Sequence, residues 1–148
     1  MGSVKIELRD TLFLTFRELE CFRQKFSRFQ DYGACSIFIG TMRDYNEGDR
    51  VLSMHLEYYP GMTEQKLAEI VNEARKNYEV LDGLLLHRVG DVQPGEDIVL
   101  VAVWSTHRKD AFGACRMIME ELKSTAPFWK KETLAGGDRW VEKNTPGK

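Results

Sequence analysis

Residues 98–127 read IVLVAVWSTHRKDAFGACRMIMEELKSTAP and set the class of the fold. The first part, Ile98–Ser105, is apolar and rich in β-branched residues, which predicts a strand. Apolar residues then recur at helical spacing and form one stripe, which consists of Ala111, Ala114, Cys115, Ile118, Met119 and Leu122. Ser105 or Thr106 can cap this helix, and Pro127 ends it. A strand followed directly by an amphipathic helix predicts a protein that mixes both kinds of element.

The flanking sequence predicts two further helices. The residues Thr15–Glu18 form a capping-box pattern, which opens a helix that ends at 31–33. A second helix is predicted at Thr63–Tyr78, where apolar residues again follow the helical period. The polar segment Asp44–Asp49 is predicted to be a turn.

The remaining segments predict strands. They are Val4–Leu8, Ala34–Met42, Val51–Tyr58, Leu84–Val89, Phe128–Glu132 and Arg139–Glu142. The resulting order is β-α-β-β-α-β-β-α-β-β. It predicts an α+β fold with packed helices and a mixed sheet, in a single domain that covers residues 1–148.

The composition is typical of a globular protein and excludes several classes. The chain is 43% hydrophobic and 30% charged, which argues against a disordered chain and a disulfide-rich mini-protein. Because no apolar run is long enough to cross a bilayer and the N-terminus has no apolar signal core, we expect a cytoplasmic protein with no membrane partner. The three cysteines form no CxxC pair, which favours three buried thiols in a reducing compartment over a zinc or disulfide framework.

The charge distribution indicates an anionic ligand. The net charge is −2, and we expect no nucleic-acid partner. From Lys123 to Lys148, however, six Lys and Arg residues stand against three acidic residues, whereas the rest of the chain has an acidic excess. A basic C-terminal quarter on an acidic body fits a small anion or the acidic tail of a partner protein.

Two segments are candidates for binding that anion. Thr106–Arg108 stands at the start of the third predicted helix, where free N–H groups and the helix dipole favour an anion, and where His107 and Arg108 add donors. A solvated helix start would have the same sequence. Arg43 follows the strand that contains Phe38 and Gly40, although a charge at a strand end is commonly only solvated. For His87 we expect a hydrogen-bonded structural role.

Lys123 and Lys130 are candidates for chemistry. Lys123 lies one helical turn after Met119, and Phe128 and Trp129 supply an apolar wall beside the two lysines. A lysine against such a wall loses proton affinity and can serve as an acid, base or nucleophile near neutral pH. Taken without other information, two solvated lysines beside core aromatics are the favoured interpretation.

Familiar metal, nucleotide and nucleophile motifs are not found in the sequence. It contains no GxGxxG, Walker, HExxH or GxSxG pattern, and three dispersed histidines do not define a zinc site. We therefore predict no metal site and no bound cofactor. Cationic chemistry remains: Arg, His and Lys side chains that converge on an anion.

Several motifs, in one order, resemble those of a known family. They are FIGTMR (38–43), LEYYPGM (56–62), HRVG (87–90), STHR (105–108), AF (111–112), LK (122–123), PFWKKE (127–132) and GDRWV (137–141). Together they cover most of residues 34–142 and resemble the large, catalytic subunit of molybdopterin synthase.

The resemblance implies a fold, an activity and an assembly. The fold would be an α/β hammerhead with an additional antiparallel β region. The enzyme would be a sulfurtransferase that converts cyclic pyranopterin monophosphate (precursor Z) into molybdopterin, in molybdenum-cofactor biosynthesis. The sulfur would come from the thiocarboxylated C-terminus of a small ubiquitin-like subunit. A homodimer of large subunits would form the centre of a heterotetramer.

The resemblance also implies roles for single residues. Lys123 matches the key catalytic lysine and Lys130 the second lysine of the active site. Five further positions match substrate-binding or pocket-wall residues of the family, and these are Phe38, Arg43, His107, Arg108 and Met119. His107 and Arg108 would reach the pocket from the neighbouring large subunit. The segment 143–146 departs from the family, where an arginine can follow Trp-Val-Glu.

Other interpretations of the same residues stay open. The protein could be a non-catalytic module whose basic groove binds an extended acidic peptide tail through strand addition, with the lysines as electrostatic contacts only. A small phosphate-ester hydrolase is a weaker alternative, since neither a metal set nor a nucleophile is evident.

Overall fold

A mixed four-stranded sheet lies at the centre of the computed structural model, which describes residues 3–25 and 29–141. The strand order is β1-β6-β8-β2. The strands are β1 (Val4–Arg9), β6 (Asp82–Arg88), β8 (Asp97–Ser105) and β2 (Ala34–Thr41). β1 runs parallel to β6, whereas β6–β8 and β8–β2 are antiparallel pairs. β2 is therefore an edge strand of this sheet.

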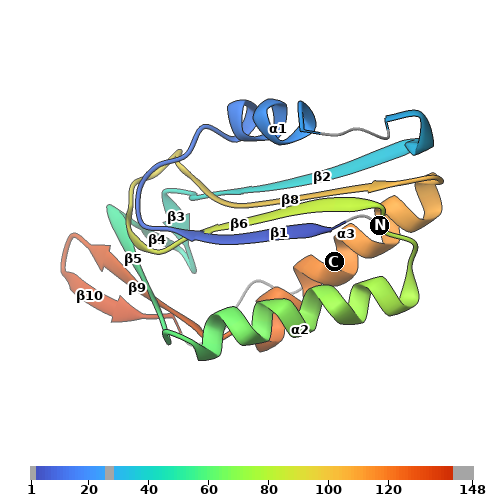
Figure 1. Cartoon of the computed structure of the whole chain (residues 1–148). Helices are drawn as coiled ribbons and strands as arrows, with labels where there is room; N and C mark the ends of the chain where they lie inside the picture. The colour runs from blue at the N-terminus through green and yellow to red at the C-terminus, as the bar shows by residue number, and fades with distance from the viewer. Residues whose placement is uncertain (1–2, 26–28, 142–148) are drawn as a thin grey trace.

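Helices cover both faces of the central sheet (Figure 1). α2 (Met62–Asn77) and α3 (Arg108–Thr125) lie on one face, and α1 (Thr15–Arg23), followed by a 3-10 turn at Phe29–Asp31, lies on the other. Alternate residues of β8 serve the two cores: Val101 packs toward α2 and α3, and Leu100 packs toward α1. This double burial explains why the sequence of β8 is apolar throughout.

A second, antiparallel sheet lies at one end of the molecule. Its order is β10-β9-β5-β7, and its strands are β10 (Gly137–Trp140), β9 (Phe128–Leu134), β5 (Ser53–Tyr58) and β7 (Gly90–Val92). A short hairpin, β3 (Tyr45–Asn46) and β4 (Asp49–Arg50), occupies the predicted polar turn. The predicted α+β fold with an additional antiparallel β region is thus confirmed.

The start and end of the first helix differ from the prediction. The Thr15 hydroxyl does not cap α1 but donates to Asp97 at 2.5 Å, and Glu18 pairs with Arg9 at 2.6 Å. The predicted capping box is wrong because Thr15 and Glu18 bind side chains outside the helix instead of the first turn. α1 also ends at Arg23, well before 31–33.

The start of α3 also lacks the predicted side-chain cap. Its N-cap residue is His107, which makes no capping hydrogen bond. Ser105 instead donates its hydroxyl hydrogen to the Glu79 carbonyl at 2.7 Å, so the prediction of a Ser105 or Thr106 cap is wrong. The expectation of three buried thiols is also wrong: Cys115 is buried, but Cys21 and Cys35 are exposed.

Two further observations bear on the expectations. No helix in the described parts of the chain combines the length and hydropathy that a membrane span requires. The predicted last strand extends to Glu142, which lies outside the described residues, as does the departing segment 143–146.

Candidate active site

A cavity of about 80 Å³ opens where the end of α3 meets both sheets. It is lined by residues of β2, β6, β8, β9 and the last turns of α3. They are Phe38, Gly40, Thr41, His87, Ile98, Val99, Leu122, Lys123, Ala126, Phe128 and Lys130. The two candidate lysines therefore share one cavity, with an aromatic wall beside them.

A tight turn between α3 and β9 brings Lys123 and Lys130 together. The N–H of Ala126 donates to the Leu122 carbonyl at 3.3 Å, which closes the last turn of α3. The Thr63 hydroxyl donates to the Pro127 carbonyl at 3.0 Å and fixes the turn to the start of α2. β9 begins at the next residue and runs back past the helix end, so a lysine on each side of the turn reaches the same cavity.

Lys130 is the more perturbed of the two amines. Its pKa is lowered from 10.5 to about 7. Burial is the largest cause, the charge of Lys123 and its hydrogen bond to Lys130 act in the same direction, and Glu132 acts in the opposite direction. Near neutral pH this amine is therefore present in both protonation states. Such a group can accept or donate a proton during a reaction without a large energetic penalty.

His87 is a cavity residue that was assigned only a structural role from the sequence. Its ring is 3% exposed and stacks on Phe128, with ring centroids 4.0 Å apart. Nδ1 lies 2.7 Å from the Arg88 carbonyl, so this nitrogen carries the hydrogen and donates it. The His87 pKa is lowered to about 3, mainly by burial and in smaller part by the charges of the two nearby lysines, while the hydrogen bond to the Arg88 carbonyl acts in the opposite direction. The imidazole is thus neutral at physiological pH.

The remaining pocket-wall candidates lie at different depths. Phe38 lines the cavity and is 40% exposed. Met119, one turn before Lys123, is buried in the core between the helices and the sheet rather than in the cavity lining. The expected aromatic wall consists of Phe128 without Trp129, which is 46% exposed and lies near Tyr59.

The three anion-binding candidates do not line this cavity within one chain. Arg43 is exposed, two residues beyond Thr41. His107 and Arg108 are exposed at the opposite end of α3 from Lys123. At 1.5 Å per residue, the sixteen positions from His107 to Lys123 span about 24 Å along the helix axis. A site that uses His107 and Arg108 together with Lys123 therefore needs these two residues from a second chain.

Metal-ligand chemistry is not evident in the described part of the chain. Among residues 3–25 and 29–141, no group of three or more His, Cys, Asp or Glu side chains is arranged to hold a metal ion. The cavity instead combines two amines, a neutral imidazole and aromatic surface, which suits an anionic, partly aromatic ligand.

The sequence matches the family model described as MoaE protein over residues 16–125. This chain belongs to the MoaE family. A curated relative from Ralstonia nicotianae, named molybdopterin synthase catalytic subunit, is 56% identical over 110 residues, which are 74% of this chain and 62% of that protein. The matched region thus spans less than two thirds of that relative.

Solved structures of the MoaE family share the fold. The MoaE protein from Burkholderia ambifaria MC40-6 is 40% identical with a TM-score of 0.75, and the match covers 100% of this chain and 94% of that one. The crystal structure of molybdopterin synthase from Staphylococcus aureus is 31% identical with a TM-score of 0.79, with 91% and 95% of the two chains covered.

Proposed function

We propose that this MoaE-family chain is the catalytic subunit of a molybdopterin synthase. It would convert cyclic pyranopterin monophosphate into molybdopterin, with sulfur from the thiocarboxylated C-terminus of a small ubiquitin-like subunit. The observation that carries the proposal is the contact between Lys123 and Lys130 inside one cavity, in a chain whose relatives are named for this activity.

The charges of the reactants explain why such a site needs two amines. The cyclic phosphate of the substrate is an anion, and the thiocarboxylate that must approach it is another. Cationic side chains at the meeting point offset their repulsion and stabilise negative charge that develops during sulfur attack. Lys123 and Lys130 supply positive charge in the cavity.

The same pair can also move protons. Two ammonium groups in hydrogen-bond contact repel each other, so Lys130 binds its proton weakly beside Lys123. With a pKa of about 7, Lys130 can be neutral or charged near neutral pH. Lys123 would act as general acid and base or form a transient covalent bond, and Lys130 would exchange the accompanying proton.

The size of the cavity supports a site that is completed by other chains. Pockets for small ligands usually enclose roughly 300–1,000 Å³, whereas this cavity encloses about 80 Å³. The pterin would rest at the mouth, against Phe38, with Arg43 nearby. His107 and Arg108 of a second large subunit would close the site, which places a homodimer of large subunits within a heterotetramer.

The proposal places the protein in the cytoplasm. Cys21 and Cys35 are exposed free thiols. Exposed thiols of this kind are typical of a reducing compartment, where they stay unoxidised.

Reconstitution from purified components tests the proposed activity. The chain is mixed with a thiocarboxylated small subunit and precursor Z, and the dithiolene product is assayed. We expect product from the unmodified chain and little or none from Lys123→Ala, with both proteins equally folded by circular dichroism. Turnover by Lys123→Ala at the rate of the unmodified chain contradicts the role of Lys123.

The same assay separates the enzyme from a peptide-binding module. Lys123→Arg keeps the positive charge but removes an amine that can release its proton or form a covalent bond. A module that only binds an acidic tail tolerates this change, and its affinity for the small subunit stays the same. We expect Lys123→Arg to bind the small subunit and yet to form little product.

A further inference from the structure

Glu132 lies beside Lys130 on the inner face of β9. Alternate residues of a strand point to the same side, so Phe128, Lys130 and Glu132 share the face turned toward the interior. Two positions along a strand are about 7 Å apart. Glu132 is only 5% exposed, which is unusual for a carboxylate and requires specific partners.

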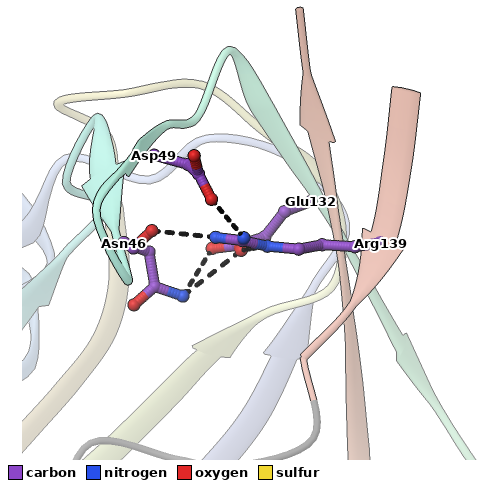
Figure 2. A network of polar contacts seen from close by, with 4 residues as sticks. All are labelled: Asn46, Asp49, Glu132 and Arg139. Atoms are coloured by element: carbon purple, nitrogen blue, oxygen red, sulfur yellow. Dashed lines mark hydrogen bonds and ion pairs between the residues drawn. The ribbon is translucent and has the colours of Figure 1, made fainter. Parts of the chain in front are cut away.

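Both oxygens of Glu132 accept hydrogen bonds from other elements (Figure 2). Oε1 accepts from Nε of Arg139 at 2.9 Å and from Nδ2 of Asn46 at 3.2 Å. Oε2 accepts from the same Asn46 amide nitrogen at 3.0 Å. The carboxylate is thus held by β10 on one side and by the β3–β4 hairpin on the other.

Arg139 is itself held by the hairpin. Its Nη1 donates to Asp49 at 2.7 Å and its Nη2 donates to the Asn46 carbonyl at 2.8 Å. The guanidinium therefore divides its charge between two carboxylates, Glu132 and Asp49. Together these three side chains have a net charge of −1, and Glu132 is the member that shares the inner face of β9 with Lys130.

We propose that Glu132, fixed by Asn46 and Arg139, is a positioning residue of the lysine cavity. It anchors β9 so that Lys130 faces Lys123, and it supplies the negative charge that balances the two amines. This inference rests on the proposed function for its catalytic meaning, but the arrangement of charges can be tested without substrate.

The charged groups around Lys130 fit this role. Lys123 faces it from α3 and lowers its pKa, whereas Glu132 on β9 raises it. His87 of β6, the third titratable group of the cavity, is neutral because burial lowers its own pKa to about 3. Glu132 therefore contributes a negative charge that favours protonation of Lys130, against the larger opposing effects of burial and of Lys123.

Competitive acetylation of the purified full-length chain tests the proposal. A low dose of acetic anhydride is applied between pH 5 and 10, and mass spectrometry follows the labelling of Lys130, which gives its apparent pKa. Glu132→Gln keeps the shape and loses the charge. Because the Glu132 charge raises the Lys130 pKa, we expect its removal to raise the neutral fraction of Lys130 at pH 5.5 severalfold.

Matched variants separate this effect from a general loss of structure. Asp49→Asn removes the same charge at the far side of Arg139 and should change Lys130 labelling much less. Arg139→Gln removes the positive charge beside Glu132, so it should raise the Lys130 pKa and slow Lys130 labelling. This variant tests the same interaction if Glu132→Gln does not fold. Unchanged Lys130 labelling in Glu132→Gln, or equal changes in Glu132→Gln and Asp49→Asn, overturns the proposal.

The pH profile of sulfur transfer adds a second readout. In Glu132→Gln the acidic limb of the rate profile should move to lower pH by the same amount as the labelling curve. A chain that shows the labelling shift but forms no molybdopterin in its unmodified form would contradict the proposed function and leave the placement of Glu132 intact. If the unmodified chain forms molybdopterin but Glu132→Gln shows no labelling shift, the placement of Glu132 is contradicted and the proposed function is left intact.

Discussion

Replacing Lys130 with methionine removes a buried amine and keeps most of the length and volume of the side chain. The pKa of Lys130 is about 7 in the folded protein, and the main cause is burial, followed by Lys123. In the unfolded chain the amine returns to the ordinary lysine value of about 10.4. The folded protein therefore holds this proton less tightly than the unfolded chain does.

The sign of the pH dependence follows from this difference. Between about pH 7 and 10.4 the unfolded chain binds more protons, so stability of the unmodified protein rises with pH. The destabilising effect of Lys130 is complete below pH 7 and fades as the pH approaches 10.4. With one pKa unit worth about 1.4 kcal/mol, Lys130→Met should gain up to about 5 kcal/mol at pH 6 and about 2 kcal/mol at pH 9.

Urea unfolding, followed by tryptophan fluorescence at pH 6 and pH 9, measures both gains. The control is Lys131→Met, because Lys131 lies on the other face of β9, pairs with Asp138 at 3.6 Å and is 40% exposed. We expect no pH-dependent gain from the control. A Lys130→Met variant that is destabilised at pH 6, or that gains equally at both pH values, refutes the reasoning that Lys130 is buried against Lys123.

Two further predictions concern residues outside the cavity. Arg108→Ala should weaken pterin binding and leave the affinity for the small subunit unchanged, as measured by calorimetry with each ligand; a loss confined to small-subunit binding would show that Arg108 contacts that subunit instead. Iodoacetamide at pH 8 should modify Cys21 before Cys35. Although Cys35 is exposed as a residue, its thiol is partly buried and lies near Cys115, which raises its pKa to about 11 and lowers its thiolate fraction. Peptide mass spectrometry gives the order, and faster labelling of Cys35 would contradict it.

The elements that follow from burial were predictable from the sequence. All six residues of the predicted α3 stripe, from Ala111 to Leu122, are buried. The strand Ile98–Ser105 was placed to within one residue. Periodicity identifies such elements because the spacing of apolar residues along the chain reflects which face meets the core.

Features that depend on distant partners were not predictable. Thr15 and Ser105 are residue types that commonly cap helices, but their hydroxyl groups donate hydrogen bonds to Asp97 and to the Glu79 carbonyl. The short strand β7 also went unpredicted, because three residues are too few to show alternation. At the two hydroxyl groups tertiary contacts outweigh local preference, whereas β7 is too short to leave a pattern in the sequence.

Some residues of the candidate site could be predicted from the sequence and others could not. Lys123 and Lys130 were singled out because they are close in sequence, on either side of Pro127. The residues alone favoured two solvated lysines, and the resemblance assigned both to the active site. His87 was missed as a cavity residue, since only the packing of β6 under the end of α3 brings it to the lysines. The separation of His107 from Lys123 could be foreseen only from the resemblance, which implies two chains.

The number of residues in the turn at Pro127 decides which side chains of β9 face the cavity. Side chains of β9 point inward and outward by turns, so removal of one residue before Phe128 would bring Lys131 into the cavity in place of Lys130. An amine would still be present, yet Thr133 would then stand where Glu132 accepts its hydrogen bonds, and Trp129 would replace the ring that stacks on His87. Lys130 and Lys131 thus look interchangeable in the sequence. Because side chains alternate between the two faces of a strand, only one of them can point into the cavity.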